Sequence, residues 1–235
     1  MPAVRRRHGA ARGGRGLELS LELETPHGPA RAHLHPVDEP CAALVLGHGA
    51  GGGVAARDLV AATRAANAAG VSVALVEQPY RVAGRRSPPR APVLDADWTA
   101  VVEQLAGGPL RDLPLIAGGR SSGARVACRT AQETGAIAVL CLAFPLVAPS
   151  GTSRQEELDG AGVPVLVVQG ASDRFGLPEP SATRTVVVVT GDHGLRSDAP
   201  AVTDAVAGWL PAILAGARRR PAAATADFRS SPRRA

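Results

Sequence analysis

Residues 113–129 read "LPLIAGGRSSGARVACR". The apolar run "LPLIA" leads directly into "GRSSG" at 119–123, and a helix-like segment follows. This order matches G-x-S-x-G, in which a serine stands at a sharp turn between a strand and a helix. An ordinary Gly/Ser loop is the alternative, because a chain with 27 Gly meets the motif by chance. The position between a strand and a helix favours the sharp turn.

Such a turn makes specific demands on its residues. We expect Ser121 to adopt a positive φ, an unfavourable value for a residue other than Gly. A Cβ at Gly119 or Gly123 would collide with the neighbouring strand or helix. The turn would raise the Ser121 hydroxyl above the sheet, and the N–H of Ser122 at the helix start would point the same way. Ser121 is therefore a candidate nucleophile.

The runs on either side of this turn are typical of a parallel sheet covered by helices. Six short segments are continuously apolar and rich in β-branched residues, as strands buried on both faces are. They are "AALVL", "VSVALV", "LPLIA", "AIAVLCLAF", "VPVLVVQ" and "TRTVVVV". Helix-like segments at 57–70, 93–108, 122–135 and 199–216 lie between or after them. The alternation predicts the α/β class, with a doubly wound, mostly parallel sheet.

Two of these helices carry residues with a local meaning. Asp95 is a candidate N-cap of the segment 93–108, and Pro211 should kink or split the last helix. Before the first buried run, "LELSLELE" at 17–24 alternates apolar and polar residues, and "ARAHLH" at 30–35 follows a turn. The two segments predict an N-terminal antiparallel hairpin. Residues 147–162 leave room for one short helix and no large cap.

The basic charge of the chain is concentrated at its two ends. The net charge is +5 and every Lys/Arg position is Arg. Residues 1–16 hold five Arg, and residues 217–235 hold six Arg and one Asp. The segment 17–216 then carries 15 Arg against 20 acidic residues, a net charge of −5. We expect a single domain at 17–216 between two disordered basic tails, and no nucleic-acid binding by the domain itself.

Nothing in the composition points to a membrane or to a bound metal. We find no apolar stretch of about 18 residues and no secretory signal, and therefore expect a cytoplasmic protein without membrane insertion. Cys41, Cys128 and Cys141 form no C-x-x-C pair. We expect buried free thiols, and neither a metal site nor a cofactor.

A serine hydroxyl needs a base to take its proton, and a third group to orient that base. On sharp turns of this kind the partners follow in the order serine, acid, histidine. Asp173 follows the buried run "VPVLVVQ", and His193 follows "TRTVVVV" in the loop "TGDHG". His48 precedes Ser121 and does not fit this order. The sequence therefore predicts a Ser121–Asp173–His193 triad at the carboxyl ends of three strands.

The loop "LGHGAGGG" at 46–53 follows the first buried run. Glycines let backbone N–H groups approach a developing oxyanion closely. We assign one oxyanion donor to the N–H of Ala50 or Gly51 and the other to the N–H of Ser122. A phosphate-binding loop is a poorer interpretation, because no Lys follows. The match to a dinucleotide G-x-G-x-x-G is weak by itself.

A second loop, "EQPYRVAGRRSPPR" at 77–90, should line the same rim of the sheet. Its Tyr80, Arg81, Arg85 and Arg86 could hold a carboxylate or phosphate of a substrate, since guanidinium groups bind such groups bidentately. A solvated basic loop with Glu77 as an internal partner is the alternative.

Several segments together resemble a known family. "LGHGAGGG", "EQPYRVAGRRSP", "LDADW", "AGGRSSGARVACR", "AFPL", "VQGASDRFG" and "GDHGL", in order over about residues 40 to 196, are similar to the small α/β-hydrolases of the testis-expressed and chromatin-complex (KANL/Tex) type. Dienelactone hydrolases are a more distant likeness. The resemblance implies the α/β-hydrolase fold, the triad above and a hydrolase activity without a defined substrate. The absence of a large cap favours a small ester, thioester or amide. Some members serve as scaffold components, so a non-catalytic interaction protein is the alternative function.

Overall fold

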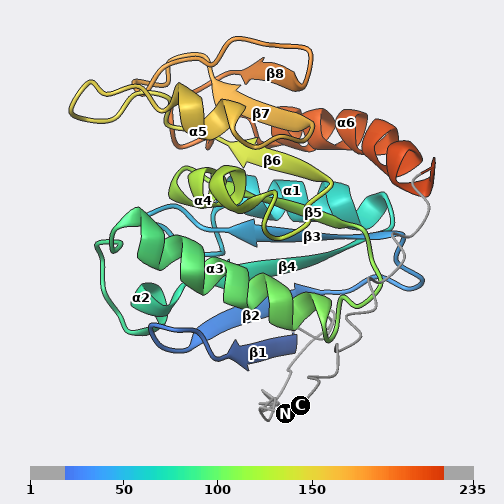
Figure 1. Ribbon diagram of the computed structural model, residues 1–235. Coiled ribbons are helices and arrows are strands. Elements are labelled where there is room, and N and C mark those ends of the chain that lie inside the picture. Colours follow the sequence, from blue (N-terminus) through green and yellow to red (C-terminus); the bar gives the residue numbers. More distant parts are fainter. Residues whose placement is uncertain (1–18, 220–235) are drawn as a thin grey trace, which may run out of the picture.

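The apolar runs of the sequence form one eight-stranded sheet in the computed structural model, which describes residues 19–219 (Figure 1). In chain order the elements are β1 (Leu19–Leu23), β2 (Ala30–His35), β3 (Ala42–Gly47), α1 (Arg57–Ala68), β4 (Val71–Glu77), α2 (Pro79–Val82), α3 (Ala91–Ala106), β5 (Leu115–Arg120), α4 (Ser122–Thr130), β6 (Ala138–Leu142), α5 (Gln155–Asp159), β7 (Val165–Gly170), β8 (Arg184–Val189) and α6 (Ala199–Arg219).

The strand order places the functional loops together. Across the sheet the order is β1-β2-β4-β3-β5-β6-β7-β8. β1, β2 and β4 pair antiparallel, and all the other neighbours pair parallel. The predicted fold class and the N-terminal hairpin are confirmed. The chain leaves β3 for β4 on one side and returns to β5 on the other, which opens a crevice at the carboxyl ends of β3 and β5.

Helices cover both faces of the sheet, as continuously apolar strands require. On one face α3 and α4 pack over a core centred on the fully buried Trp98. On the other face α1 and α6 pack together and contribute Leu59, Val202 and Leu210 to a second core. Figure 1 shows the two layers on opposite sides of the strands. Between β6 and β7 the only helix is the five-residue α5, so no large cap covers the crevice.

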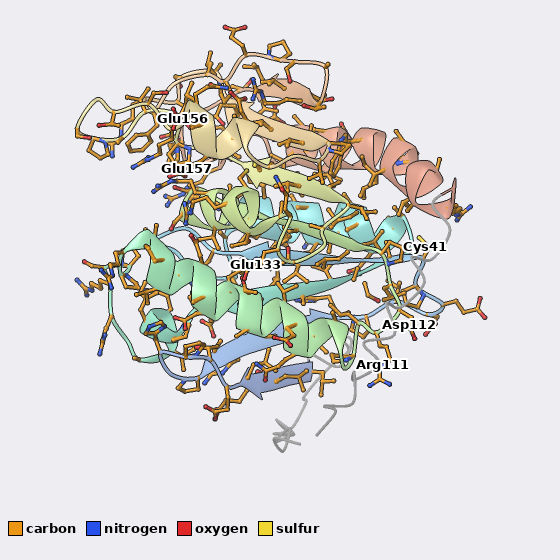
Figure 2. The ribbon with its side chains drawn as sticks, viewed as in Figure 1. Cys41, Arg111, Asp112, Glu133, Glu156 and Glu157 are labelled. Atoms are coloured by element: carbon orange, nitrogen blue, oxygen red, sulfur yellow. The ribbon has the colours of Figure 1, made fainter. Side chains whose placement is uncertain are left out.

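The predicted cap at Asp95 is wrong, and of the kink or split predicted at Pro211 the split does not occur. Asp95 does not cap α3, because the helix already begins at Ala91. Its carboxylate instead accepts from Arg129 on α4, at 2.6 Å and 2.8 Å. Arg129 also pairs with Glu157 of the short helix α5, which Figure 2 labels. α6 is not split at Pro211, because the proline lies on the exposed side where the freed carbonyl is open to water.

α6 runs past the predicted domain end at residue 216. The remainder of both predicted tails lies outside the described residues. Among residues 19–219, α6 alone is long and apolar enough to cross a membrane, judged by length and composition only. The expectation that no stretch reaches this length therefore does not hold for α6. Its buried side chains, among them Val202 and Val206, pack in the core described above.

The cysteines are free thiols. Cys128 of α4 and Cys141 of β6 are buried with their Sγ atoms 3.5 Å apart, and burial raises the pKa of Cys141 well above its ordinary value. Cys41 is only half-buried, so the expectation of a buried thiol is wrong there. It precedes β3 and lies with Asp112 at the amino edge of the sheet (Figure 2).

Candidate active site

The "GRSSG" segment forms the expected sharp turn between β5 and α4. Ser121 has φ 52° and ψ −106°, which confirms the predicted positive φ. A backbone in this region costs on the order of 1–3 kcal/mol for a residue with a side chain. α4 begins at the next residue, Ser122. Within residues 19–219, the backbone N–H of Ser122 donates to no acceptor. The turn thus holds a hydroxyl and a free N–H together at the carboxyl edge of the sheet.

The glycines of this turn pack directly against β3. An ideal Cβ on Gly119 would lie 2.5 Å from the carbonyl oxygen of Gly47, and one on Gly123 would lie closer still. Gly47 itself is crowded, since its Cβ would lie 3.1 Å from the ring of Trp98. The predicted collisions are confirmed. Three glycines therefore let α4 approach β3 closely enough to point its N-terminus into the crevice.

Ser121, His193 and Asp173 lie in one hydrogen-bonded chain. The Ser121 Oγ is 2.9 Å from His193 Nε2, and His193 Nδ1 is 2.8 Å from Asp173 Oδ2. The Asp173 carboxylate is fully buried and the His193 side chain is 20% exposed. An ionised carboxylate only accepts hydrogen bonds, so Nδ1–H donates to Asp173 and Nε2 is left to accept the serine proton. This is the tautomer that a general base needs.

Two neighbours hold Asp173, and sequence analysis missed both. Gln169 on β7 donates from Nε2 to Asp173 Oδ2 at 2.8 Å, and the N–H of Phe175 donates to Oδ1 at 2.9 Å. The Phe175 ring meets the His193 ring edge-on, with centroids 4.6 Å apart. Both residues fall within the quoted segment "VQGASDRFG". The signal available in the sequence was a glutamine that ends an apolar run, and the structure buries this glutamine fully.

The loop after β3 is held by His48, which sequence analysis set aside as a base. His48 Nδ1–H donates to the Gly49 carbonyl at 2.9 Å, and Nε2 accepts from the N–H of Gln78 at 3.2 Å. The Tyr80 hydroxyl donates to the Ala50 carbonyl at 3.1 Å. Tyr80 is buried, and burial raises its pKa to about 12. These side chains fix the loop from behind.

The front of the same loop faces Ser121. An ideal Cβ on Gly49 would lie 3.6 Å from the Ser121 Cβ and 2.7 Å from Arg120 Nη1. The Gly52 N–H bonds the Gly49 carbonyl and closes a turn. Within the described part of the chain, the N–H groups of Ala50 and Gly51 donate to no acceptor. Free donors therefore lie on both loops that border the serine.

His48 makes the protein sensitive to acid, because its bonding pattern requires the neutral ring. Burial lowers the pKa of His48 below its ordinary value of 6.5. The unfolded chain therefore binds a proton that the folded chain excludes, so this part of the stability is present above pH 6.5 and is lost as the pH falls. We expect the free energy of unfolding to fall more steeply between pH 7 and pH 5 in the wild type than in His48→Gln. Urea titrations at each pH measure it, and equal slopes would contradict the assignment.

The arginines of the predicted binding loop make no side-chain contact with the triad residues within residues 19–219. Arg81 is half-buried on α2 and donates to the Arg85 carbonyl at 3.3 Å, and Arg85 and Arg86 are exposed. Their role in holding an anion stays a prediction. Glu77 pairs with Arg31 and His33 of β2 and not with this loop, so the alternative internal partner is wrong.

A different arginine touches the triad. Arg120, next to Ser121, donates from Nη2 to the His193 carbonyl at 2.9 Å. Its Nε lies 2.9 Å from Asp58 Oδ2 of α1, whose side chain is buried. Burial raises the pKa of Asp58, and the Arg120 guanidinium partly offsets this rise. The pair ties the His193 loop, the serine turn and α1 together. Within residues 19–219, no three His, Cys, Asp or Glu side chains come close enough to hold a metal ion.

Comparison with known families gives a match over most of the domain. Residues 40–202 match the model described as "Alpha/beta hydrolase domain". The chain belongs to the alpha/beta hydrolase family. A sequence search among curated proteins finds no match.

Solved α/β-hydrolase structures share the fold at low identity. Est1E from Butyrivibrio proteoclasticus is 17% identical with a TM-score of 0.69, and the match covers 83% of this chain and 99% of Est1E. XC6422 from Xanthomonas campestris, described as a serine hydrolase without lid, is 20% identical with a TM-score of 0.66, over 83% of this chain and 95% of that one. Dienelactone hydrolase from Anabaena variabilis is 17% identical with a TM-score of 0.67, over 83% and 97%.

Proposed function

We propose that this α/β hydrolase is a serine hydrolase that cleaves a small ester, thioester or amide through an acyl-enzyme. The observation that carries the proposal is the continuous chain from Ser121 through His193 to Asp173, at 2.9 Å and 2.8 Å. These contacts have the length and order that nucleophilic catalysis by serine requires.

Each residue then has a defined task. Ser121 Oγ attacks the carbonyl carbon while His193 Nε2 takes the hydroxyl proton. The N–H of Ser122 and that of Ala50 or Gly51 stabilise the oxyanion, where losing one donor typically costs about 3 kcal/mol. His193 passes the proton to the leaving group, and Asp173 balances the imidazolium charge. Water, activated by His193, then attacks the acyl carbon and releases Ser121.

A fluorophosphonate probe tests this proposal. The activated serine attacks phosphorus and expels fluoride, so a stable Ser121–phosphoryl adduct should form in the wild type. We expect no labelling of Ser121→Ala. The control variant Ser122→Ala should still be labelled, at Ser121. Peptide mass spectrometry locates the adduct. Absence of any adduct on the folded wild-type protein would reject the proposal.

The alternative function, a non-catalytic interaction protein, makes the opposite prediction for turnover. Short p-nitrophenyl esters should be hydrolysed by the wild type and not by Ser121→Ala or His193→Ala. Turnover that neither substitution changes would favour the interaction protein.

Three finer assignments stay predictions: the KANL/Tex-type relationship, a cytoplasmic location, and the absence of membrane and nucleic-acid partners. The match to an α/β hydrolase domain supports a hydrolase and leaves these open to direct measurement.

A further inference from the structure

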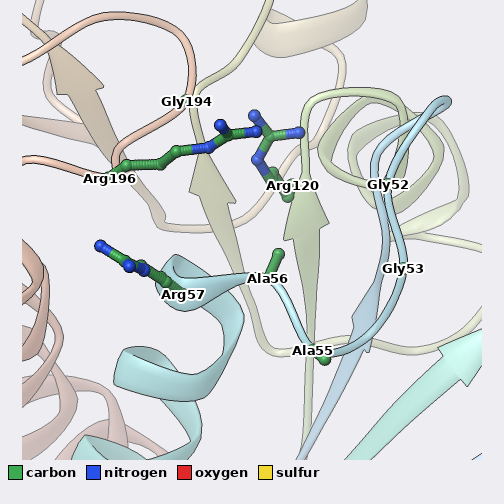
Figure 3. Close-up of a pocket in the computed structure, with 8 residues that line it drawn as sticks. All are labelled: Gly52, Gly53, Ala55, Ala56, Arg57, Arg120, Gly194 and Arg196. Carbon is green, nitrogen blue, oxygen red and sulfur yellow. The ribbon is translucent and has the colours of Figure 1, made fainter.

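A cavity of about 500 Å³ adjoins the loops that carry Ser121 and His193, and no residue of the predicted substrate loop 77–90 lines it (Figure 3). Its walls come from three places in the sequence: the loop after β3, the serine turn and the histidine loop. The residues that line it are Gly52, Gly53, Ala55, Ala56, Arg57, Arg120, Gly194 and Arg196. Arg120 and Gly194 are the direct chain neighbours of Ser121 and His193, so a substrate at the serine can reach this cavity.

The charged side chains that line this cavity are all positive. Arg120 is neutralised from behind by Asp58. Arg57 and Arg196 make no ion pair within residues 19–219. Figure 3 shows Arg196 extending toward Arg120, with Arg57 at the start of α1 below them. Both side chains are exposed, and their unpaired positive charges favour an anion in this cavity.

The backbone adds to this preference for negative charge. α1 begins at Arg57, and no side chain caps it at Ala56. In the described part of the chain the Arg57 N–H donates to no acceptor. The start of a twelve-residue helix, with its partial positive charge, therefore borders the cavity beside the arginines.

Arg196 is the residue best placed to link an anion to the reacting bond. It also lines a second cavity of about 360 Å³, which His193, Arg174, Ser172 and Asp192 share. Asp192 is the carboxylate among the residues that line this second cavity, and it accepts from the Gly194 N–H at 2.8 Å. That bond turns Asp192 toward its own loop, and no ion pair joins it to Arg196.

We propose that this α/β hydrolase selects substrates that carry a carboxylate, which binds between Arg196 and Arg57 while the scissile carbonyl lies at Ser121. This inference rests on the proposed function and adds the substrate class to it. Arg120 is a positioning residue in this arrangement, because it is committed to Asp58 and to the His193 carbonyl.

Matched esters test the selectivity. 4-Nitrophenyl hydrogen succinate carries a carboxylate on the acyl side, and 4-nitrophenyl methyl succinate is its neutral counterpart. 4-Acetoxybenzoate and its methyl ester place the same charge on the leaving group. For each pair, selectivity is kcat/KM for the anionic ester divided by kcat/KM for the neutral ester. In at least one pair, we expect Arg196→Gln to lower this ratio by about tenfold or more. Arg57→Gln should lower it in the same pair.

Two control variants separate this cavity from other positive charges. Arg64→Gln removes an exposed arginine from the same helix as Arg57 and should leave kcat/KM unchanged for both members of each pair. Arg86→Gln tests the loop predicted from sequence. If Arg86→Gln lowers the ratio and Arg196→Gln does not, the carboxylate binds at the 77–90 loop and the proposal is wrong. Equal losses on anionic and neutral esters in Arg196→Gln would also overturn it.

A binding measurement keeps this inference distinct from the proposed function. Succinate can be titrated into the Ser121→Ala protein by calorimetry, which needs no turnover. We expect binding that weakens by about tenfold or more when Arg196→Gln is added. No binding, or equal binding by the two proteins, would overturn the carboxylate site even in an active hydrolase. Succinate binding without ester turnover would instead reject the proposed function alone.

Discussion

Asp173→Asn should lower kcat for an activated ester by about 10⁴-fold, because the amide imposes the wrong tautomer on His193. In the wild type, Asp173 Oδ2 accepts from His193 and from Gln169, and Oδ1 accepts from the Phe175 N–H. All three partners are donors. An asparagine offers one oxygen and one NH₂ group, so either orientation of the amide faces a donor with a donor.

One orientation keeps the oxygen toward the Phe175 N–H, which is backbone and cannot turn away, and places the NH₂ against both His193 and Gln169. Nδ1 must then accept, the proton moves to Nε2, and Nε2 no longer takes the proton of Ser121. Steady-state kinetics with p-nitrophenyl acetate measures the loss. Asp204→Asn is the matched control, since Asp204 is exposed on α6. A loss below tenfold in folded Asp173→Asn protein would show that Asp173 does not set the tautomer.

Gly123→Ala should destabilise the fold by about 3 kcal/mol, the upper part of the usual range for overpacking. An ideal Cβ at this position would lie within 3.0 Å of three backbone atoms of Gly47. Backbone cannot rotate away as a side chain can, so α4 would have to move off β3. That movement would also shift Ser121 and the N–H of Ser122, and activity should fall together with stability.

The control for this substitution has the opposite sign. Gly208 lies on the exposed face of α6, and its Cβ would meet nothing within 4 Å. Gly208→Ala should raise the free energy of unfolding by about 0.5–1 kcal/mol, the difference in helix propensity. Urea denaturation followed by circular dichroism measures both variants. If Gly123→Ala were as stable as the wild type, α4 would not be packed against β3 as described.

The elements that sequence analysis predicted well are those that local chemistry dictates. Five of the six apolar runs become buried strands because each is apolar on both faces over its own length. The sixth, β8, lies at the edge of the sheet and leaves Val188 exposed, so the expectation of a strand buried on both faces is wrong there. The turn at Ser121 is recognisable because its glycines and its strand–helix context lie within eleven residues, 113–123. Asp173 and His193 were predictable because each follows an apolar strand, and parallel strands bring their carboxyl ends to one edge.

Other parts depend on residues that are distant in the sequence, and these parts were missed. His48 was set aside by its order in the chain, yet it bonds the N–H of Gln78, 30 residues away, and so shapes the loop beside the serine. The contact of Tyr80 with substrate stays a prediction, whereas the bond from its hydroxyl to the Ala50 carbonyl was not foreseen. No local pattern announces either contact, because each depends on how β3 and β4 pair.

By itself the sequence determined the class of the fold, the position of the sharp serine turn and the order of the three residues of the proposed triad. Apolar periodicity, glycine content and chain order are local properties, and they suffice for these features. The tertiary structure alone decided which charges share a cavity. Arg57 begins α1, Arg120 ends β5 and Arg196 lies in the loop after β8, so only the folded arrangement of these elements brings them to one cavity. Charge acts through space over several ångströms, so the preference of a site for an anion follows from the folded distances and not from spacing along the chain.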